Sequence, residues 1–177
     1  DLNGIVQKAV ERHSPDIDRR KQQLAVTLAD RVVWVDADTT RLEQVIGNLL
    51  NNASKYNNPG GHIWLSVGAQ DEQAVIRVQD DGIGMPPELL PNIFDMFTQV
   101  DRTLEQSQGG LGIGLTIVQR MVELHGGRVE ARSPGPNQGS EFVVRLPVVG
   151  EASTRTGSEG EQDQKMAQPR RNEVQIK

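Results

Sequence analysis

The pattern of apolar and polar residues changes its period several times along this chain, and each period predicts a different kind of element. A helical period runs through residues 2–13, and a stronger one runs through residues 41–56. Alternation typical of half-buried strands is found at residues 23–28, 32–36, 62–69, 74–80, 127–133 and 139–146. We expect the first two strands to pair around residues 29–31, and a polar turn at residues 70–73 to separate the next two. The pattern predicts an α/β sandwich, with a mixed, mostly antiparallel sheet that carries its helices on one face.

The helix over residues 41–56, RLEQVIGNLLNNASKY, has several distinct faces. An α-helix turns about 100° per residue, so spacing decides which side chains lie together. One face is polar and is made of Gln44, Asn48, Asn52, Lys55 and Tyr56. The adjoining arc predicts a core stripe, made of Leu42, Val45, Ile46, Leu49, Leu50 and Ala53. The remaining side holds Glu43, Gly47 and Ser54 and can face water.

The polar face of this helix has two interpretations. For a helix taken alone, a solvated surface is the simpler one. Asparagine is a poor helix former, however, and Asn48, Asn51 and Asn52 lower the helix propensity where lysine or glutamate would cost less. This cost favours a binding face.

The strand predicted over residues 74–80 ends at a carboxylate beside two glycines, in the sequence AVIRVQDDGIGM. Asp80 at this position can accept a hydrogen bond from a ligand amine, while Gly82 and Gly84 let the bare backbone approach a ring. A simple turn explains the same glycines equally well. Alone, this motif does not establish a site.

A second glycine-rich segment, GGLGIGLTIVQRMVELHGG, leads into a predicted amphipathic helix. Its glycines precede apolar positions at helical spacing, namely Leu115, Val118, Met121 and Val122. Free backbone N–H groups and the positive end of the helix dipole suit phosphate oxygens at such a junction. The chain contains neither G-x-G-x-x-G nor G-x-x-x-x-G-K-[ST], the dinucleotide and P-loop motifs. Together with the amide helix, the segment favours an ATP pocket without a Walker loop over a flexible loop.

Four motifs in one order resemble the catalytic, ATP-binding domain of two-component sensor histidine kinases, in the gyrase, Hsp90, histidine kinase and MutL superfamily with the Bergerat fold. They are NLLNNASKY (N box), DDGIG (G1 box), IFDMF (F box) and GGLGIGL (G2 box), and GSEFVVRLP resembles the closing strand. The resemblance covers about residues 1–148 and implies a catalytic domain there. Residues 149–177 are rich in Gly, Ser, Gln and Glu, which predicts a disordered linker or tail.

The resemblance implies roles at the phosphate end of the site. Asn52 is similar to the asparagine that holds Mg²⁺ against the phosphates, and Asn48 would line the same site one turn earlier. Lys55 would touch phosphate, and Tyr56 would border the nucleotide.

The resemblance also implies an adenine end and a lid. Asp80, and not Asp81, would accept the adenine amino group, with Gly82 and Gly84 close to the base. The lid glycines would meet phosphate, and the implied nucleotide contacts there are Gly110, Leu111, Gly112, Gly114 and Leu115. The aromatic residues that would pack the other end of the lid are Phe94 and Phe97. We expect residues 98–110 to form this lid.

Two departures from related patterns matter for the chemistry. ATPases of the gyrase and Hsp90 type place a glutamate where this chain has Asn48, and an amide cannot act as a general base. Hydrolysis of ATP should therefore be slow. In the lid, a position that is often basic in the family holds Gln106, which leaves Arg102 as the expected cation for the γ-phosphate.

No histidine of the chain lies in a phosphoacceptor motif of the S-H-E-x-R-T-P kind. His13 is followed two residues later by a proline and is expected near a helix end. His62 is expected to open a strand, and His125 precedes two glycines as a helix C-terminal residue would. These positions favour structural roles for all three. Because the chain begins with Asp1, we interpret it as a piece of a longer protein.

Composition agrees with this interpretation. The 177 residues have a net charge of −5, which argues against a nucleic-acid surface. Zero cysteines exclude disulfides and thiolate metal sites. No apolar run approaches the roughly 20 residues that span a bilayer. We therefore expect a cytoplasmic fragment without membrane contact, whose parent protein can carry an anchor elsewhere.

The leading hypothesis is a histidine kinase catalytic domain with ATP and Mg²⁺ as cofactors. Its partners would be a histidine-bearing dimerisation domain and a response regulator or receiver domain, as in hybrid kinases. One alternative is a nucleotide-sensing interaction module that transfers no phosphate. Another is an anti-sigma-type serine kinase of the same superfamily, which would normally carry a carboxylate in place of Asn48.

Overall fold

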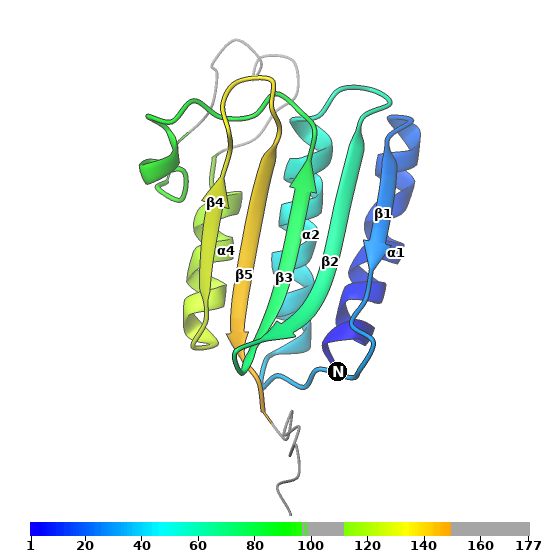
Figure 1. Ribbon diagram of the computed structural model, residues 1–177, viewed down its shortest axis with the longest axis vertical. Helices are drawn as coiled ribbons and strands as arrows, with labels where there is room; N and C mark the ends of the chain where they lie inside the picture. Colours follow the sequence, from blue (N-terminus) through cyan, green and yellow to red (C-terminus); the bar gives the residue numbers. More distant parts are fainter. Residues whose placement is uncertain (97, 99–111, 150–177) are drawn as a thin grey trace, which may run out of the picture.

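The computed structural model describes residues 1–96, 98 and 112–149. Within these ranges it contains a five-stranded sheet with the strand order β1-β2-β3-β5-β4. The helices lie together on one face of this sheet (Figure 1). The helices are α1 (Leu2–Arg19), α2 (Thr39–Lys55) and α4 (Gly114–Leu124), with a short 3-10 helix η1 (Leu90–Asn92). The strands are β1 (Gln23–Thr27), β2 (His62–Gln70), β3 (Gln73–Asp80), β4 (Arg128–Arg132) and β5 (Ser140–Pro147).

The mixed sheet confirms the predicted fold class. Strand β1 pairs in parallel with β2, and all other neighbours are antiparallel. The β2–β3 hairpin turns through Asp71 and Glu72, with φ of 51° and 60°. Two left-handed residues match the right-handed twist of the strands in a two-residue turn. The resulting register places Asp80, at the end of β3, opposite Ile63 at the start of β2.

The core lies between the sheet and the helices. The predicted stripe of α2 is confirmed, because Leu42, Val45, Ile46, Leu49, Leu50 and Ala53 are all buried. On the sheet side, Ile63, Leu65, Ile76, Val144 and Leu146 are each at most 1% exposed. Burial of this apolar surface holds α2 against the sheet. It therefore fixes where the polar face of α2 lies.

The prediction that residues 23–28 and 32–36 form a strand pair was wrong. Strand β1 pairs with β2, and residues 32–36 form no regular strand. The alternation there is real, since Val33 is buried and Trp34 is exposed. Its backbone partners, however, are the start of α1 (Leu2 N–H to Val33 O, 2.9 Å) and the chain after β5 (Val149 N–H to Trp34 O, 2.9 Å). An alternating pattern indicates which side chains are buried, but it does not show which segment forms the backbone hydrogen bonds.

Helix α1 is longer than predicted, so His13 does not lie near a helix end. The helix continues through Pro15 to Arg19. Proline removes one backbone hydrogen bond, yet Ile17 beyond it is buried against the core at 1% exposure. Burial of Ile17 favours continuation of the helix past Pro15.

The third side of α2 faces α1 and not water, which corrects our expectation for Gly47 and Ser54. Both are buried. A Cβ at position 47 would meet the imidazole ring of His13. Glu43 at the same side lies 3.5 Å from Arg12. Burial lowers the pKa of His13; the Asp16 charge offsets part of that lowering, and the Arg12 charge adds to it.

Inside a helix, alanine usually raises stability by roughly 1 kcal/mol relative to glycine. We expect Gly47→Ala to show none of this gain in the free energy of unfolding. The added methyl group would meet the His13 ring. In a His13→Ala background the same substitution should stabilise the domain by about 1 kcal/mol. Urea unfolding of the two single variants and the double variant measures this coupling. A full gain in Gly47→Ala alone would contradict the packing of α1 on α2.

Candidate nucleotide-binding site

The elements that carry the predicted site residues meet at one end of the sandwich. Figure 1 shows the C-terminal end of α2, the end of β3, the β4–β5 turn and the start of α4 all at the upper end of the molecule. A backbone hydrogen bond from Ile83 N–H to Tyr56 O, 3.0 Å, joins the loop after β3 to the end of α2. The sequence motifs at residues 48–56 and 80–84 therefore lie side by side.

The polar face of α2 is partly open. Asn48, Asn52, Lys55 and Tyr56 are half-buried, whereas Gln44 is exposed. The Lys55 ammonium donates to the Tyr56 hydroxyl at 3.2 Å and lies 4.8 Å from the centre of that ring. This contact restrains a long, flexible cation at the end of the helix. The face offers amide oxygens first and an ammonium group one turn later.

Asp80 is a buried carboxylate, only 4% exposed. One oxygen accepts from the Gly82 N–H at 2.9 Å, and the other accepts from the Ser140 hydroxyl at 2.5 Å. Burial raises the pKa of Asp80, and the hydrogen bonds from Ser140 and Gly82 offset part of that rise. Such a fixed acceptor in a low-dielectric setting suits a directed hydrogen bond from a ligand amine. Ser140 was not predicted as a site residue.

The glycines after Asp80 are required by the protein's own packing. A Cβ at Gly82 would clash with the Tyr56 carbonyl oxygen, and Gly84 has φ of 62°. A Cβ at Gly84 would clash with the Gly135 carbonyl oxygen. The interpretation of these glycines as a tight turn is thus sufficient. Their approach to an adenine ring stays a prediction.

The β4–β5 turn forms a wall of the site that sequence reasoning missed. Gly139 N–H donates to Gly82 O at 3.0 Å, and Asn137 N–H donates to Ile83 O at 2.6 Å. The Ser133 hydroxyl accepts from Met85 N–H at 2.9 Å. The Pro and Gly residues of this segment signal a turn. No local signal shows that the turn would clamp a loop about fifty residues earlier in the chain.

The start of α4 carries no side-chain cap. Its N-cap is Ile113, which has no polar side-chain atom, whereas α1 and α2 are capped by the carboxylates of Asp1 and Asp38. Gly112 just before it has φ of 65°. Within the described residues, the first N–H groups of α4 therefore have no side-chain acceptor and can receive an anion.

The start of α4 is also tied to the F-box segment. The Thr116 hydroxyl donates to Phe94 O at 2.8 Å, and Phe94 packs edge-on to Phe142 at 6.4 Å between ring centres. Gly114 and Leu115 are half-buried in the first turn. Of the predicted lid and nucleotide residues, Phe97, Arg102, Gln106, Gly110 and Leu111 lie outside the described residues.

The donor set fits a magnesium ion only together with a phosphate ligand. Among the described residues, no group of three or more His, Cys, Asp or Glu side chains is arranged so that it could hold a metal ion. Magnesium commonly takes one or two protein oxygens and completes its shell with phosphates and waters. The half-buried amides of Asn52 and Asn48 supply oxygens of this kind.

Each histidine makes structural contacts. His125 follows the last residue of α4, as predicted; its Nδ1–H donates to Met121 O at 2.7 Å, and its Nε2 accepts from Asp38 N–H at 3.0 Å. His62 is the first residue of β2, as predicted, and pairs with Asp81 at 2.9 Å. His13 lies against Gly47.

Comparisons with known proteins identify the family to which the described fold and motifs correspond. The family described as "Histidine kinase-, DNA gyrase B-, and HSP90-like ATPase" matches residues 37–150. The alginate biosynthesis sensor protein KinB of Pseudomonas aeruginosa is 36% identical over 84% of this chain and 24% of its own length. The circadian input-output histidine kinase CikA of Synechococcus elongatus is 39% identical over 70% of this chain and 16% of its own. The chain spans about a quarter or less of such curated relatives.

A solved structure supports the same assignment. Full-length ShkA in complex with AMPPNP superposes with a TM-score of 0.74 at 29% identity, over 86% of this chain and 31% of that one. The chain therefore belongs to the histidine kinase-, DNA gyrase B- and HSP90-like ATPase family. Its relatives within the family are sensor histidine kinases, as the motifs implied. In the part of the chain that is described, no helix is long and apolar enough to cross a membrane.

Proposed function

We propose that this domain binds Mg²⁺-ATP and delivers the γ-phosphoryl group to a histidine on a separate dimerisation domain, as a step in two-component signalling. One observation carries the proposal. The buried Asp80 carboxylate and the amide face of α2 lie at the same end of the sandwich, joined by the bond between Ile83 and Tyr56. Family membership supports the nucleotide class.

The proposed roles come from the resemblance of the motifs to the family, and the described geometry supports them. Asp80 would accept the adenine amino group, and Asn52 would supply an amide oxygen to the metal, with Asn48 lining the same site one turn earlier. Lys55, restrained by Tyr56, places positive charge beside the phosphates. The open start of α4 adds backbone N–H donors. In phosphoryl transfer the protein mainly positions the reactants and neutralises charge. When bound, Mg²⁺ supplies part of that neutralisation.

The transfer step needs a nucleophile from outside the described residues. A neutral imidazole nitrogen of the partner domain attacks the γ-phosphorus, the bond between the γ-phosphorus and the bridging oxygen breaks, and ADP leaves. The other imidazole nitrogen releases its proton to solvent water as the phosphoramidate forms. We further propose that the phosphorylated histidine serves a response regulator or receiver domain, and that the domain works in the cytoplasm. Arg102 is the proposed lid cation.

The isolated chain is expected to bind Mg²⁺-ATP without labelling itself and without rapid hydrolysis. Asn48 cannot take a proton from water, and the three histidines are engaged in structural contacts. Incubation with γ-labelled ATP, followed by counting of protein-bound and released phosphate, tests this. The proposed mechanism would be overturned by a stable label on the fragment alone. Hydrolysis of ATP at about 1 per second or faster, as is typical of enzymes, would also overturn it.

A further inference from the structure

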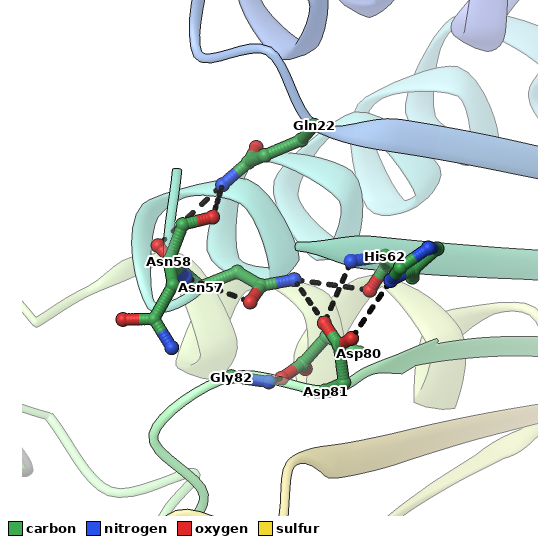
Figure 2. Close-up of polar contacts among 7 residues, drawn as sticks. All are labelled: Gln22, Asn57, Asn58, His62, Asp80, Asp81 and Gly82. Carbon is green, nitrogen blue, oxygen red and sulfur yellow. Dashed lines mark hydrogen bonds and ion pairs between the residues drawn. The ribbon is translucent and has the colours of Figure 1, made fainter. Parts of the chain in front are cut away.

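Next to the proposed adenine carboxylate, Asp81 joins the ends of two other elements. One Asp81 carboxylate oxygen accepts from the Asn57 side-chain amide at 2.9 Å and from the His62 backbone N–H at 2.6 Å. The other lies 2.9 Å from the His62 ring nitrogen Nδ1. Figure 2 shows these contacts converging from the end of α2, the start of β2 and the end of β3.

Asn57, the other half of this contact, is itself tightly held. It is 8% exposed, and its amide group also donates to His62 O at 3.0 Å while its oxygen accepts from Asn58 N–H at 2.7 Å. A Cβ at Gly61 would clash with the Asn57 side chain. The absence of a side chain at Gly61 therefore leaves the space that the Asn57 amide occupies.

A buried glutamine supports the same end of α2 from behind. The Gln22 amide group donates to Ser54 O at 2.9 Å and to Asn58 O at 3.2 Å, and its oxygen accepts from the Ser54 hydroxyl at 2.6 Å. Carbonyls at a helix C-terminus have no partner within the helix. Gln22 satisfies one of them, the Ser54 carbonyl. It also ties the α1–β1 connection to the residues around Asn57 (Figure 2).

Asp81 stays charged in this setting. Partial burial acts to raise its pKa, but the hydrogen bonds from His62 and Asn57 outweigh it, and the net pKa is lowered. An ionised acceptor makes shorter and stronger hydrogen bonds than a neutral one. The charge on Asp81 therefore strengthens its hydrogen bond from Asn57, and the Asp81 side chain remains 42% exposed to solvent.

In the chain, the two residues directly follow the residues assigned to the two ends of the proposed nucleotide site. Asn57 follows Lys55 and Tyr56 at the phosphate end, and Asp81 follows Asp80 at the adenine end. The Asp80 carboxylate is held separately, by Gly82 and Ser140. Loss of the contact between Asn57 and Asp81 would thus leave the adenine acceptor in place. It would remove one of the ties at the end of α2, beside the Ile83–Tyr56 bond and the Gln22 contacts.

We propose that Asn57 and Asp81 are positioning residues that fix the spacing between the phosphate end and the adenine end of the site. This inference rests on the proposed function. Neither side chain needs to touch the nucleotide. A ligand that reaches both ends binds more tightly when this spacing is already fixed. None of its binding free energy is then needed to order α2 against β3. A ligand that reaches only the adenine end gains nothing from it.

The test compares Mg²⁺-ADP with adenosine on the full chain, by ¹H–¹⁵N NMR titration. In Asp81→Ala we expect the affinity for Mg²⁺-ADP to fall about tenfold or more, which is about 1.4 kcal/mol, while the affinity for adenosine stays within about twofold. Asp81→Asn keeps an oxygen acceptor for Asn57 and His62 and should recover most of the ADP affinity. Asp18→Ala, an exposed carboxylate on α1, is the matched control and should bind both ligands as the parent chain does.

The outcomes separate this inference from the proposed function. Equal losses for ADP and adenosine in Asp81→Ala would mean general damage to the site and would overturn the positioning role, as would unchanged binding of both. If Asp81→Ala does not fold, Asn57→Ala carries the same expectation and the same contradictions. If the parent chain binds Mg²⁺-ADP no more tightly than adenosine, the proposed function is contradicted instead.

Discussion

Asp80→Asn is expected to weaken the binding of ATP and ADP alike by roughly 10- to 150-fold, because a hydrogen bond to a charged group contributes about 1.5–3 kcal/mol. The adenine contact is common to both nucleotides, so their affinity ratio should not change. Calorimetric titration of each nucleotide into the parent chain and the variant measures this. Unchanged ATP affinity in Asp80→Asn would remove the carboxylate from the site.

The same variant should fold at least as well as the parent chain at neutral pH. Burial raises the folded-state pKa of Asp80 above its ordinary value of 3.8. A carboxyl group of this kind contributes stability below the unfolded pKa, and that contribution is lost as the pH rises through the folded pKa. At neutral pH the ionised group is therefore a cost to folding. Asparagine can still accept from Gly82 and donate to Ser140. A thermal melt of Asp80→Asn thus separates lost binding from unfolding.

In Asn52→Ala we expect the gain in ATP affinity that Mg²⁺ provides to shrink by about 100-fold or more. Residues that only support a metal ligand already change metal affinity by about 10- to 100-fold. Affinity for ATP in excess EDTA should stay close to that of the parent chain. Alanine has the higher helix propensity, so α2 should persist. Titrations with and without Mg²⁺ measure the difference.

The neighbouring asparagine supplies a matched control for this variant. Asn51 is exposed and lies beside α1 residues such as His13 and Asp16, away from the polar face that holds Asn52. Asn51→Ala should therefore keep the full Mg²⁺ dependence. Equal losses in both variants would indicate damage to α2 and not a lost metal ligand.

Local patterns in the sequence were sufficient for the elements that position the site. The spacing of apolar residues identified the buried stripe of α2 and, with it, the face that holds Asn48 and Asn52. The change from alternation to glycine located Asp80 at a strand end, where the structure places it. These features depend on neighbours a few residues away, and a sequence records such neighbours directly.

The features that were missed depend on partners far apart in the chain. Gly47 and Ser54 were expected to face water because a helical pattern cannot show that α1 covers them. Asn57 meets Asp81 across 24 residues, and Met85 meets Ser133 across 48. Residues 32–36 alternate as a strand does, yet their partners are the start of α1 and the chain just after β5. Burial is visible in a sequence, but the identity of the covering element is not.

The most direct test of the central claim supplies a histidine-bearing helical dimerisation domain in trans, with γ-labelled ATP and Mg²⁺. We predict label on that domain that survives base and is released by acid, as a phosphoramidate is, and none when its histidine is replaced by glutamine. Asn52→Ala should abolish the label, and Asn51→Ala should retain it. Acid-stable label, or label that persists in Asn52→Ala, would contradict transfer to histidine by this site.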